Sequence, residues 1–419
     1  MRRSGSLFIV GIIIFLLDFY IFSSLGIFTK HSSETLRLTV YSIHWVLSAT
    51  AILSLFLFPY LQSVKAAKVF LNYLMVIIVG LVLAKLIVAA FLLLDDIRRL
   101  ILLGLQLLGS ASAEGGNKGG TLERSMLLTS LGLCIGTALF LAMIYGFSNK
   151  YTYRVKQVRL RFPNLPQGFK GFRFIQISDI HSGSLLNKKR VDRGVDLLLK
   201  QDPEMVLFTG DLVNDRAVEM TGYVEIFSRI KAPMGVFSTL GNHDYGDYYW
   251  GVNPVGERAM EKARNLENLK AVHQRMGWRL LMNEHVVLKR NGDEIALLGI
   301  ENWGAKAGFP KYGKMSSAYQ GTEKYRFKIL MSHDPSHWQA EVQTKYPDID
   351  LTLSGHTHGM QFGIELPGLK WSPVQWVYKQ WAGLYEAGNQ KLYVNRGFGF
   401  IGYPGRVGIL PEITVFELE

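Results

Sequence analysis

The stretch LSGHTHGMQFG, residues 353–363, places two histidines one residue apart between two glycines, directly after the apolar run IDLTLS. Side chains alternate along an extended backbone, so a strand that ends at Gly355 would direct His356 and His358 to the same side of the chain, at the rim of a sheet. This arrangement is typical of a metal site, because imidazole is the commonest metal ligand in proteins. Two polar histidines in a loop are the alternative, and the rest of the chain decides between the two.

Four other apolar runs end in the same way, with Asp, Asn or His directly after them: FRFIQISDIH, EMVLFTGDLV, GVFSTLGNHD and RFKILMSHDP. Helical patterns lie between several of these predicted strands, which indicates a mixed α/β domain. A polar strand cap explains any one of them, but all five strand ends are expected to meet at one end of one sheet, where α/β sheets assemble their sites. Oxygen and imidazole donors suit two first-row divalent metal ions. The candidate ligands are Asp179, His181, Asp211, Asn242, His333, His356 and His358.

The motifs DIH, GDL, GNHD, SHD and GHTH, in this order and at these strand ends, resemble the calcineurin-like metallophosphoesterases over about residues 172–419. The resemblance implies two packed mixed sheets flanked by helices, an αββα sandwich, and activity as a metal-dependent phosphoesterase. The C-terminal segments LYVNRGFGF and RVGILPEITVFEL are similar to the branch of this family with membrane-anchored or exported bacterial members.

The resemblance also implies a role for each motif residue. One ion would be held by Asp179, His181 and His358, and the second by Asn242, His333 and His356, with Asp211 bridging both. His243 would be the catalytic residue that protonates the leaving group or stabilises the transition state. Imidazole and carboxylate accept manganese, iron, zinc or cobalt, and only geometry would choose among them.

Two positions depart from the family pattern. An Asp three residues after the bridging Asp often orients the catalytic histidine, but GDLVND places Asn214 there and Asp215 one residue later. Either residue could orient His243. Met360 stands where this branch more often has Gly, which would put an apolar side chain near the mouth of the pocket.

The N-terminal third has a different character, in a chain whose 48% hydrophobic content and positive mean hydropathy of +0.14 are together too apolar for an ordinary soluble protein. Its basic start would also suit a signal peptide, but no small-residue cleavage site follows a short apolar core, so the first stretch is expected to remain as a span. We predict a four-span domain over residues 1–149 and a metallophosphoesterase domain over residues 150–419. The expected spans, each about as long as a bilayer core requires, are Leu7 to Phe28, Leu38 to Leu61, Val69 to Leu94 and Met126 to Phe147.

The loop over residues 95–125 is expected to begin with an interfacial helix, DDIRRLILLGLQLLG, and to continue as a flexible linker, SASAEGGNKGG. Asp18 and Lys85 each lie near the middle of a predicted span, where charge is costly. A buried pair that fixes helix register and a role in handling substrate are both open for these two residues.

The distribution of Lys and Arg around the spans predicts both termini in the cytoplasm, which corresponds to an inner membrane protein with a cytoplasmic catalytic domain. The only cysteine, Cys134, lies within the fourth span, so the soluble part needs no oxidising compartment. Basic residues on the predicted cytoplasmic side are Arg2, Arg3, Lys65, Lys68, Lys150, Arg154, Lys156, Arg159 and Arg161. Those on the other side are Lys30, Arg37, Arg98, Arg99, Lys118 and Arg124.

The segment GLKWSPVQWVYKQWAGLY, with Trp371, Trp376 and Trp381 beside Lys370 and Lys379, has the composition of a surface at the lipid headgroup level. Ordinary packing of aromatic side chains is the alternative. A formal net charge of +12 favours anionic lipid surfaces and phosphorylated substrates. Nucleic acid is not an expected partner, since no nucleic-acid-binding module is recognisable.

These features predict a membrane-anchored dinuclear hydrolase that cleaves a phosphoester or pyrophosphate bond in a lipid-linked substrate. Family members that cleave UDP-2,3-diacylglucosamine are the precedent that the resemblance supplies. One alternative is a phosphodiesterase or phosphatase for soluble nucleotides or phosphoproteins, anchored by its membrane domain. A non-catalytic transmembrane sensor or transport protein is the other, and the complete ligand set argues against it.

Overall fold

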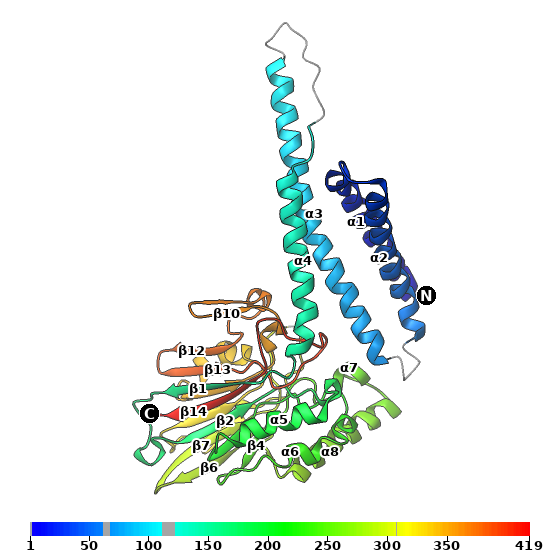
Figure 1. The fold of residues 1–419 in the computed structure, drawn as a ribbon. Coiled ribbons are helices and arrows are strands. Elements are labelled where there is room, and N and C mark those ends of the chain that lie inside the picture. The colour runs from blue at the N-terminus through cyan, green and yellow to red at the C-terminus, as the bar shows by residue number, and fades with distance from the viewer. Residues whose placement is uncertain (1, 62–67, 111–121, 307) are drawn as a thin grey trace. The chain divides into compact units, whose positions relative to one another are not determined.

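The computed structural model describes residues 2–61, 68–110, 122–306 and 308–419 (Figure 1). The chain divides into two compact units, Met1–Tyr145 and Gly146–Glu419, which we call the membrane unit and the catalytic unit. The predicted flexible linker, apart from Ser110, and the basic residues Lys65 and Lys118 lie outside the described residues.

Within the described residues, four helices are long and apolar enough to cross a membrane. Large apolar side chains on them are exposed in the protein alone, for example Phe8 at 62% and Leu127 at 70%, as expected of a surface that contacts lipid. The helices are α1 (Arg2–Thr29), α2 (Glu34–Leu61), α3 (Lys68–Ser110) and α4 (Met126–Asn149).

The helix α3 is much longer than a bilayer requires, since 43 residues at 1.5 Å per residue make about 64 Å. The expected interfacial helix after residue 94 is therefore not a separate element, because the third span continues through it without a break. Charged pairs interrupt the apolar surface of α3 at this point: Asp95 pairs with Arg98 at 2.8 Å, and Asp96 pairs with Arg99 and Arg124 at 3.1 Å each. Such a band of charge is typical of the level at which a helix leaves the hydrocarbon.

Asp18 and Lys85 form an ion pair of 2.5 Å inside the membrane unit. Asp18 is fully buried, and Ser48 of α2 donates a hydrogen bond to its second carboxylate oxygen. His44 Nε2 lies 3.1 Å from the backbone oxygen of Asp18. This polar cluster therefore ties α1, α2 and α3 together.

The catalytic unit contains two six-stranded mixed sheets, ordered β1-β14-β2-β3-β4-β5 and β12-β13-β9-β8-β7-β6. The remaining strands of the catalytic unit, within the described residues, form a separate two-stranded ribbon. They are β10 (Ile364–Leu366) and β11 (Leu369–Trp371). The first sheet contains β1 (Arg154–Leu160), β14 (Glu412–Leu418), β2 (Arg173–Ile177), β3 (Met205–Phe208), β4 (Val236–Ser238) and β5 (Arg279–Leu280). The second contains β12 (Gly383–Ala387), β13 (Gln390–Val394), β9 (Leu351–Ser354), β8 (Lys328–Met331), β7 (Asp293–Gly299) and β6 (Glu284–Arg290).

Helices cover the outer face of each sheet. The longest are α5 (Lys188–Leu199) and α8 (Glu257–Met276), and both pack on the first sheet. The shorter ones are α6 (Val224–Phe227), α7 (Asp247–Trp250), α9 (Met315–Tyr319) and α10 (Gln343–Lys345). The stretch YVEIFSRIKA, residues 223–232, has a helical pattern of apolar residues, but only the single turn α6 forms within it.

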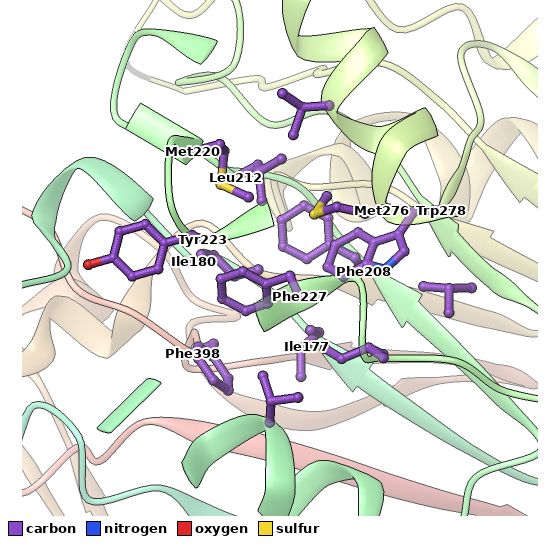
Figure 2. Packing of buried hydrophobic residues seen from close by; sticks show 14 of the residues in the cluster. Ile177, Ile180, Phe208, Leu212, Met220, Tyr223, Phe227, Met276, Trp278 and Phe398 are labelled. Carbon is purple, nitrogen blue, oxygen red and sulfur yellow. The ribbon is translucent and has the colours of Figure 1, made fainter. Parts of the chain in front are cut away.

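The layers follow from the alternation of side chains along the strands. In β3, Val206 and Phe208 point to the helices, while Met205 and Leu207 point to the second sheet. Figure 2 shows the helix-facing cluster, in which Phe208 packs with Trp278. The αββα sandwich expected from the family resemblance is thereby confirmed.

The five strand ends come from both sheets, so the prediction of a single sheet edge was wrong. Parallel neighbours β2, β3 and β4 belong to the first sheet, and parallel neighbours β8 and β9 belong to the second. Buried Gln176 of β2 donates a hydrogen bond of 2.9 Å to the Ser354 carbonyl at the end of β9. This bond holds the carboxyl ends of the two sheets together.

Candidate metal centre

All seven candidate ligands meet where the two sheets join. The loops approach so closely that two glycines are required: a Cβ on Gly355 would lie 2.2 Å from Asp179 Oδ2, and one on Gly241 would lie 2.2 Å from Asp211 Oδ1. The backbone N–H of His356 also donates to both oxygens of Asp179, at 3.0 Å each. The glycines of the GNHD and GHTH motifs are therefore needed for the approach of the loops.

Asp179, His181 and His358 form one group of potential ligands, and all three are buried. Nε2 of His181 lies 3.0 Å from Nε2 of His358, and the latter atom lies 3.3 Å from Asp179 Oδ1. Three donor atoms thus converge on one point from two loops.

Asp211, His333 and His356 form the second group. Asp211 Oδ2 lies 3.1 Å from His333 Nε2 and 3.5 Å from His181 Nε2, so this carboxylate faces both groups. The side-chain oxygen of Asn242 lies 2.8 Å from His356 Nδ1, which adds a fourth donor. The structure thus brings together the seven residues that the family resemblance names, with Asp211 between the two groups, and their assignment as metal ligands stays a prediction.

The donor chemistry fits two bound cations. Nδ1 of His333 lies 2.7 Å from the Thr209 carbonyl and donates its proton to it, so Nε2 is the nitrogen that faces Asp211. This Nε2 atom is buried and has no hydrogen-bond partner among the described residues. An imidazole nitrogen and a carboxylate oxygen at this distance are satisfied by a cation that they share, either a proton or a metal ion.

Burial sets the protonation of the ligands. It lowers the pKa of His181 and of His356, which keeps both imidazoles in the neutral form that binds metal. Burial also opposes a charge on His333, but the Asp211 carboxylate outweighs it and raises the pKa of His333 to about 10. A cation therefore competes with a proton for this nitrogen.

The backbone of the centre is strained. Asp179, His181, Asp211, His356 and His358 all have positive φ, between 48° and 74°. This conformation is uncommon for residues other than glycine, and it persists at functional sites where the surrounding structure enforces it. No sequence pattern used above predicts this feature.

His243 is oriented by a backbone group. Its Nδ1 lies 2.7 Å from the carbonyl oxygen of Asn214 and donates to it, which leaves Nε2 for proton transfer. Neither side chain proposed from the sequence, that of Asn214 or that of Asp215, makes this bond. Tyr248 stacks on the His243 ring at 4.4 Å, and its hydroxyl accepts a hydrogen bond from the side chain of Asn242.

Asp244 is a positioning residue that sequence reasoning left unassigned. Its buried carboxylate accepts backbone hydrogen bonds from Asp211, Leu212, Val213 and Gly241 at 2.8–3.2 Å. Burial and the neighbouring Asp211 carboxylate raise the pKa of Asp244 to about 7. Its place in the GNHD motif was the available signal.

Two further side chains support the ring of His356. Tyr378 Oη lies 2.9 Å from Nε2 and donates a hydrogen bond of 3.3 Å to Asp334 Oδ2. Such outer partners fix the orientation of a metal-binding imidazole. Tyr378 lies in the tryptophan-rich segment, and nothing in its spacing from the GHTH motif predicts this contact.

The tryptophans of that segment have separate environments. Trp381 is buried, Trp371 is half-buried, and Trp376 is 74% exposed. Trp376 therefore has the exposure expected of a residue at the lipid headgroup level, whereas Trp381 packs inside the protein, as the alternative predicts. Met360 is 56% exposed, and its place at the mouth of a pocket stays a prediction.

Comparison with known proteins agrees with this geometry. The model of the family described as calcineurin-like phosphoesterase matches residues 172–360. A second model, described as the transmembrane domain of a probable calcineurin-like phosphoesterase, matches residues 2–150. The chain belongs to the calcineurin-like phosphoesterases. This phosphoesterase is a metal-dependent enzyme with a membrane domain, as the sequence predicts.

Relatives occur in bacteria and in animals. The uncharacterized metallophosphoesterase YkuE of Bacillus subtilis is 29% identical over 61% of this chain and 82% of its own length. A transmembrane protein with metallophosphoesterase domain from Danio rerio is 28% identical over 76% of this chain and 68% of its own. The phosphodiesterase YaeI of Escherichia coli is 27% identical over 59% of this chain and 82% of its own.

Proposed function

We propose that this phosphoesterase hydrolyses a phosphoester or pyrophosphate bond in a lipid-linked substrate at the surface of its own membrane. A UDP-diacylglucosamine-type compound is one representative of this class. The single observation that carries the proposal is the position of Trp376 and Val377, which are exposed by 74% and 53% and directly precede Tyr378, the partner of His356. An apolar surface thus adjoins the candidate metal centre in a protein with four membrane helices.

In the proposed mechanism, one ion would be held by Asp179, His181 and His358 and the other by Asn242, His333 and His356, and Asp211 would contribute to both sites. When bound, two divalent ions supply Lewis-acid chemistry and charge stabilisation for phosphoryl transfer. His243 delivers a proton to the leaving oxygen from Nε2, because Nδ1 is fixed by the Asn214 carbonyl. Tyr248 limits rotation of that ring by stacking on it.

The test compares two substrates with the full chain in detergent or lipid. We expect Trp376→Ala to lower kcat/KM for a lipid pyrophosphate at least tenfold, about 1.4 kcal/mol of transition-state stabilisation, and to change hydrolysis of a small aryl phosphate little. Val218→Ala is the control, because Val218 is 61% exposed and lies outside this segment. No turnover of any lipid-linked phosphate by a preparation active on the aryl phosphate would overturn the proposal.

A soluble phosphodiester is the second candidate, and the relative YaeI, which is named as a phosphodiesterase, favours it. With the membrane unit acting only as an anchor, nucleotide phosphodiesters would be cleaved by wild type and Trp376→Ala at equal rates. A parallel screen of nucleotide phosphodiesters and phosphoproteins distinguishes this outcome.

We also propose that the catalytic unit faces the cytoplasm from an inner membrane. The support is the run of basic residues that follows the fourth span, Lys150, Arg154, Lys156, Arg159 and Arg161. Protease added to spheroplasts is expected to spare the catalytic unit. Efficient digestion from outside would reverse the orientation and move the substrate to the outer leaflet.

A further inference from the structure

The ribbon of β10 and β11 has two chemically different faces. The strands pair in the register Ile364–Trp371, Glu365–Lys370 and Leu366–Leu369. Directly opposite residues of an antiparallel pair share a face, so Glu365 and Lys370 lie on one side and the four apolar residues on the other.

The charged face is bound to the catalytic unit. Glu365 accepts hydrogen bonds from Arg396 at 2.6 and 3.0 Å and from Lys156 at 2.6 Å. The ammonium of Lys370 donates to the Ala382 carbonyl and lies over the ring of Trp381 at 4.7 Å. These contacts fix which way the ribbon faces and turn its apolar side outward.

The outward face is apolar and exposed. Ile364, Leu366 and Leu369 are exposed by 44%, 61% and 51%. Trp376 packs edge-on against Trp371 at 6.1 Å and extends this surface beyond the ribbon. An apolar patch of this kind marks an interaction site on most soluble domains. We call Ile364, Leu366, Leu369, Trp371, Trp376 and Val377 the apolar patch.

The patch is joined to the end of the last membrane helix through contacts inside the catalytic unit. The carbonyl of Gly146, in the last turn of α4, accepts a hydrogen bond of 2.9 Å from the Arg406 backbone. The next residue, Val407, forms a bridge with Phe362 and accepts a hydrogen bond of 2.9 Å from Gly363. The ribbon begins at the following residue, Ile364, so its base lies where α4 ends.

The chemistry of this place matches a bilayer surface. The apolar stretch from Met126 to Phe147 is long enough to cross a bilayer, so the turn at Gly146 is expected at the headgroup level. Strands of three residues make a ribbon only about 10 Å long, comparable to the depth of the headgroup region. Tryptophan with a neighbouring exposed lysine, here Trp376 and Lys379, is the composition found at that level.

We propose that the apolar patch inserts into the lipid leaflet in which α4 ends, and so holds the catalytic unit against the membrane. The bound partner is the lipid surface itself. This inference does not depend on the substrate, since a soluble substrate would leave the insertion unchanged. It differs from simple anchoring by the four helices because it fixes a particular face of the catalytic unit to the bilayer.

The test is the depth of spin labels in the full chain, reconstituted into phosphatidylcholine and phosphatidylglycerol vesicles. Cys134→Ser removes the only native cysteine, and Leu366→Cys, Leu369→Cys or Val218→Cys then adds one label site. Val218 is a matched control, since it is exposed by 61%, as is Leu366. Hydrolysis of an aryl phosphate verifies that each variant is folded.

We expect labels at 366 and 369 to be reached several-fold more readily by oxygen, which partitions into lipid, and several-fold less readily by a water-soluble nickel complex, than the label at 218. Equal exposure to the nickel complex at all three positions would overturn the proposal. Protection from both reagents that persists in detergent would also overturn it, because a second copy of the chain would then cover the patch.

Discussion

The polar cluster of the membrane unit and the candidate metal centre of the catalytic unit both bury charge, but they differ in what faces that charge. In the membrane unit, an ammonium and a hydroxyl face the carboxylate of Asp18: Lys85 forms an ion pair with one oxygen, and Ser48 donates a hydrogen bond to the other. In the metal centre, His181 Nε2 faces His358 Nε2, and His333 Nε2 faces Asp211 across 3.1 Å.

The backbone conformation also differs between the two clusters. Asp18, Ser48 and Lys85 lie within regular helices, whereas five of the seven candidate ligands have positive φ. A cluster that is closed on itself fixes the packing of helices. In the candidate metal centre, a strained backbone directs metal-binding donor atoms toward one another. This arrangement is explained if the centre is organised around bound cations. The predictions that follow test this difference.

The largest effect is expected for Asp211→Ala, since this carboxylate faces both groups of ligands. We predict loss of both metal ions and of detectable aryl phosphate hydrolysis. Metal content is measured by elemental analysis and folding by circular dichroism. Retention of both ions by a folded variant would show that Asp211 bridges nothing.

His243→Ala is expected to lower turnover by a factor of about 10² to 10⁴, the usual contribution of a positioned acid or base. Metal content should stay close to that of wild type, because His243 contributes no donor atom to either group. The measurement is kcat beside elemental analysis. Metal loss as severe as in Asp211→Ala would mean that His243 is a ligand instead.

In the membrane unit, Lys85→Met leaves the buried Asp18 carboxylate without its counter-charge. We predict a loss of about 3–5 kcal/mol in the unfolding free energy of that unit, and recovery of much of it when Asp18→Asn is added. Unfolding is followed in a denaturing detergent titration. A fall in kcat of the folded variant without a loss of stability would instead give the pair a functional role.

The candidate ligands could be named from the sequence because they lie in short local motifs, each directly after an apolar strand. The GHTH and GNHD motifs identify which side chains converge, but not that their loops come from two sheets. That arrangement depends on long-range packing between the two sheets, in which the hydrogen bond from Gln176 to Ser354 is one contact. Residues separated by more than a hundred positions carry no periodic signal that links them.

The supporting residues escaped prediction for the same reason. Tyr378 reaches His356 from a segment whose composition indicated a lipid surface, and the backbone carbonyl of Asn214 leaves no side-chain signature. The long helix α3 was divided in the prediction at Asp95 and Asp96, because charge commonly ends a span. Their ion pairs allow the helix to continue past them.

The smallest effect is expected for Asp215→Asn, since the orienting group of His243 is the Asn214 carbonyl. Turnover at pH 8 should stay within a few-fold of wild type. A decrease comparable to that of His243→Ala would assign the orienting role to the Asp215 side chain.

The stability that this variant gains over wild type should depend on pH. Burial and the nearby Glu219 raise the pKa of Asp215 to about 6. A carboxyl with a raised pKa in the folded state is harder to ionise there, so its ionisation destabilises the fold as pH rises from about 4 to 6. Asp215→Asn should therefore gain thermal stability relative to wild type at pH 8, and gain less at pH 5. An equal change at both pH values would exclude this titration.

The most direct test of the account is the metal content of the intact, active protein purified from the membrane. Two groups of donors with Asp211 between them predict two divalent ions per chain, and predict that a chelator removes hydrolytic activity and divalent ions restore it. One ion per chain in a fully active preparation, or none, would contradict the assignment of these seven residues to a dinuclear centre.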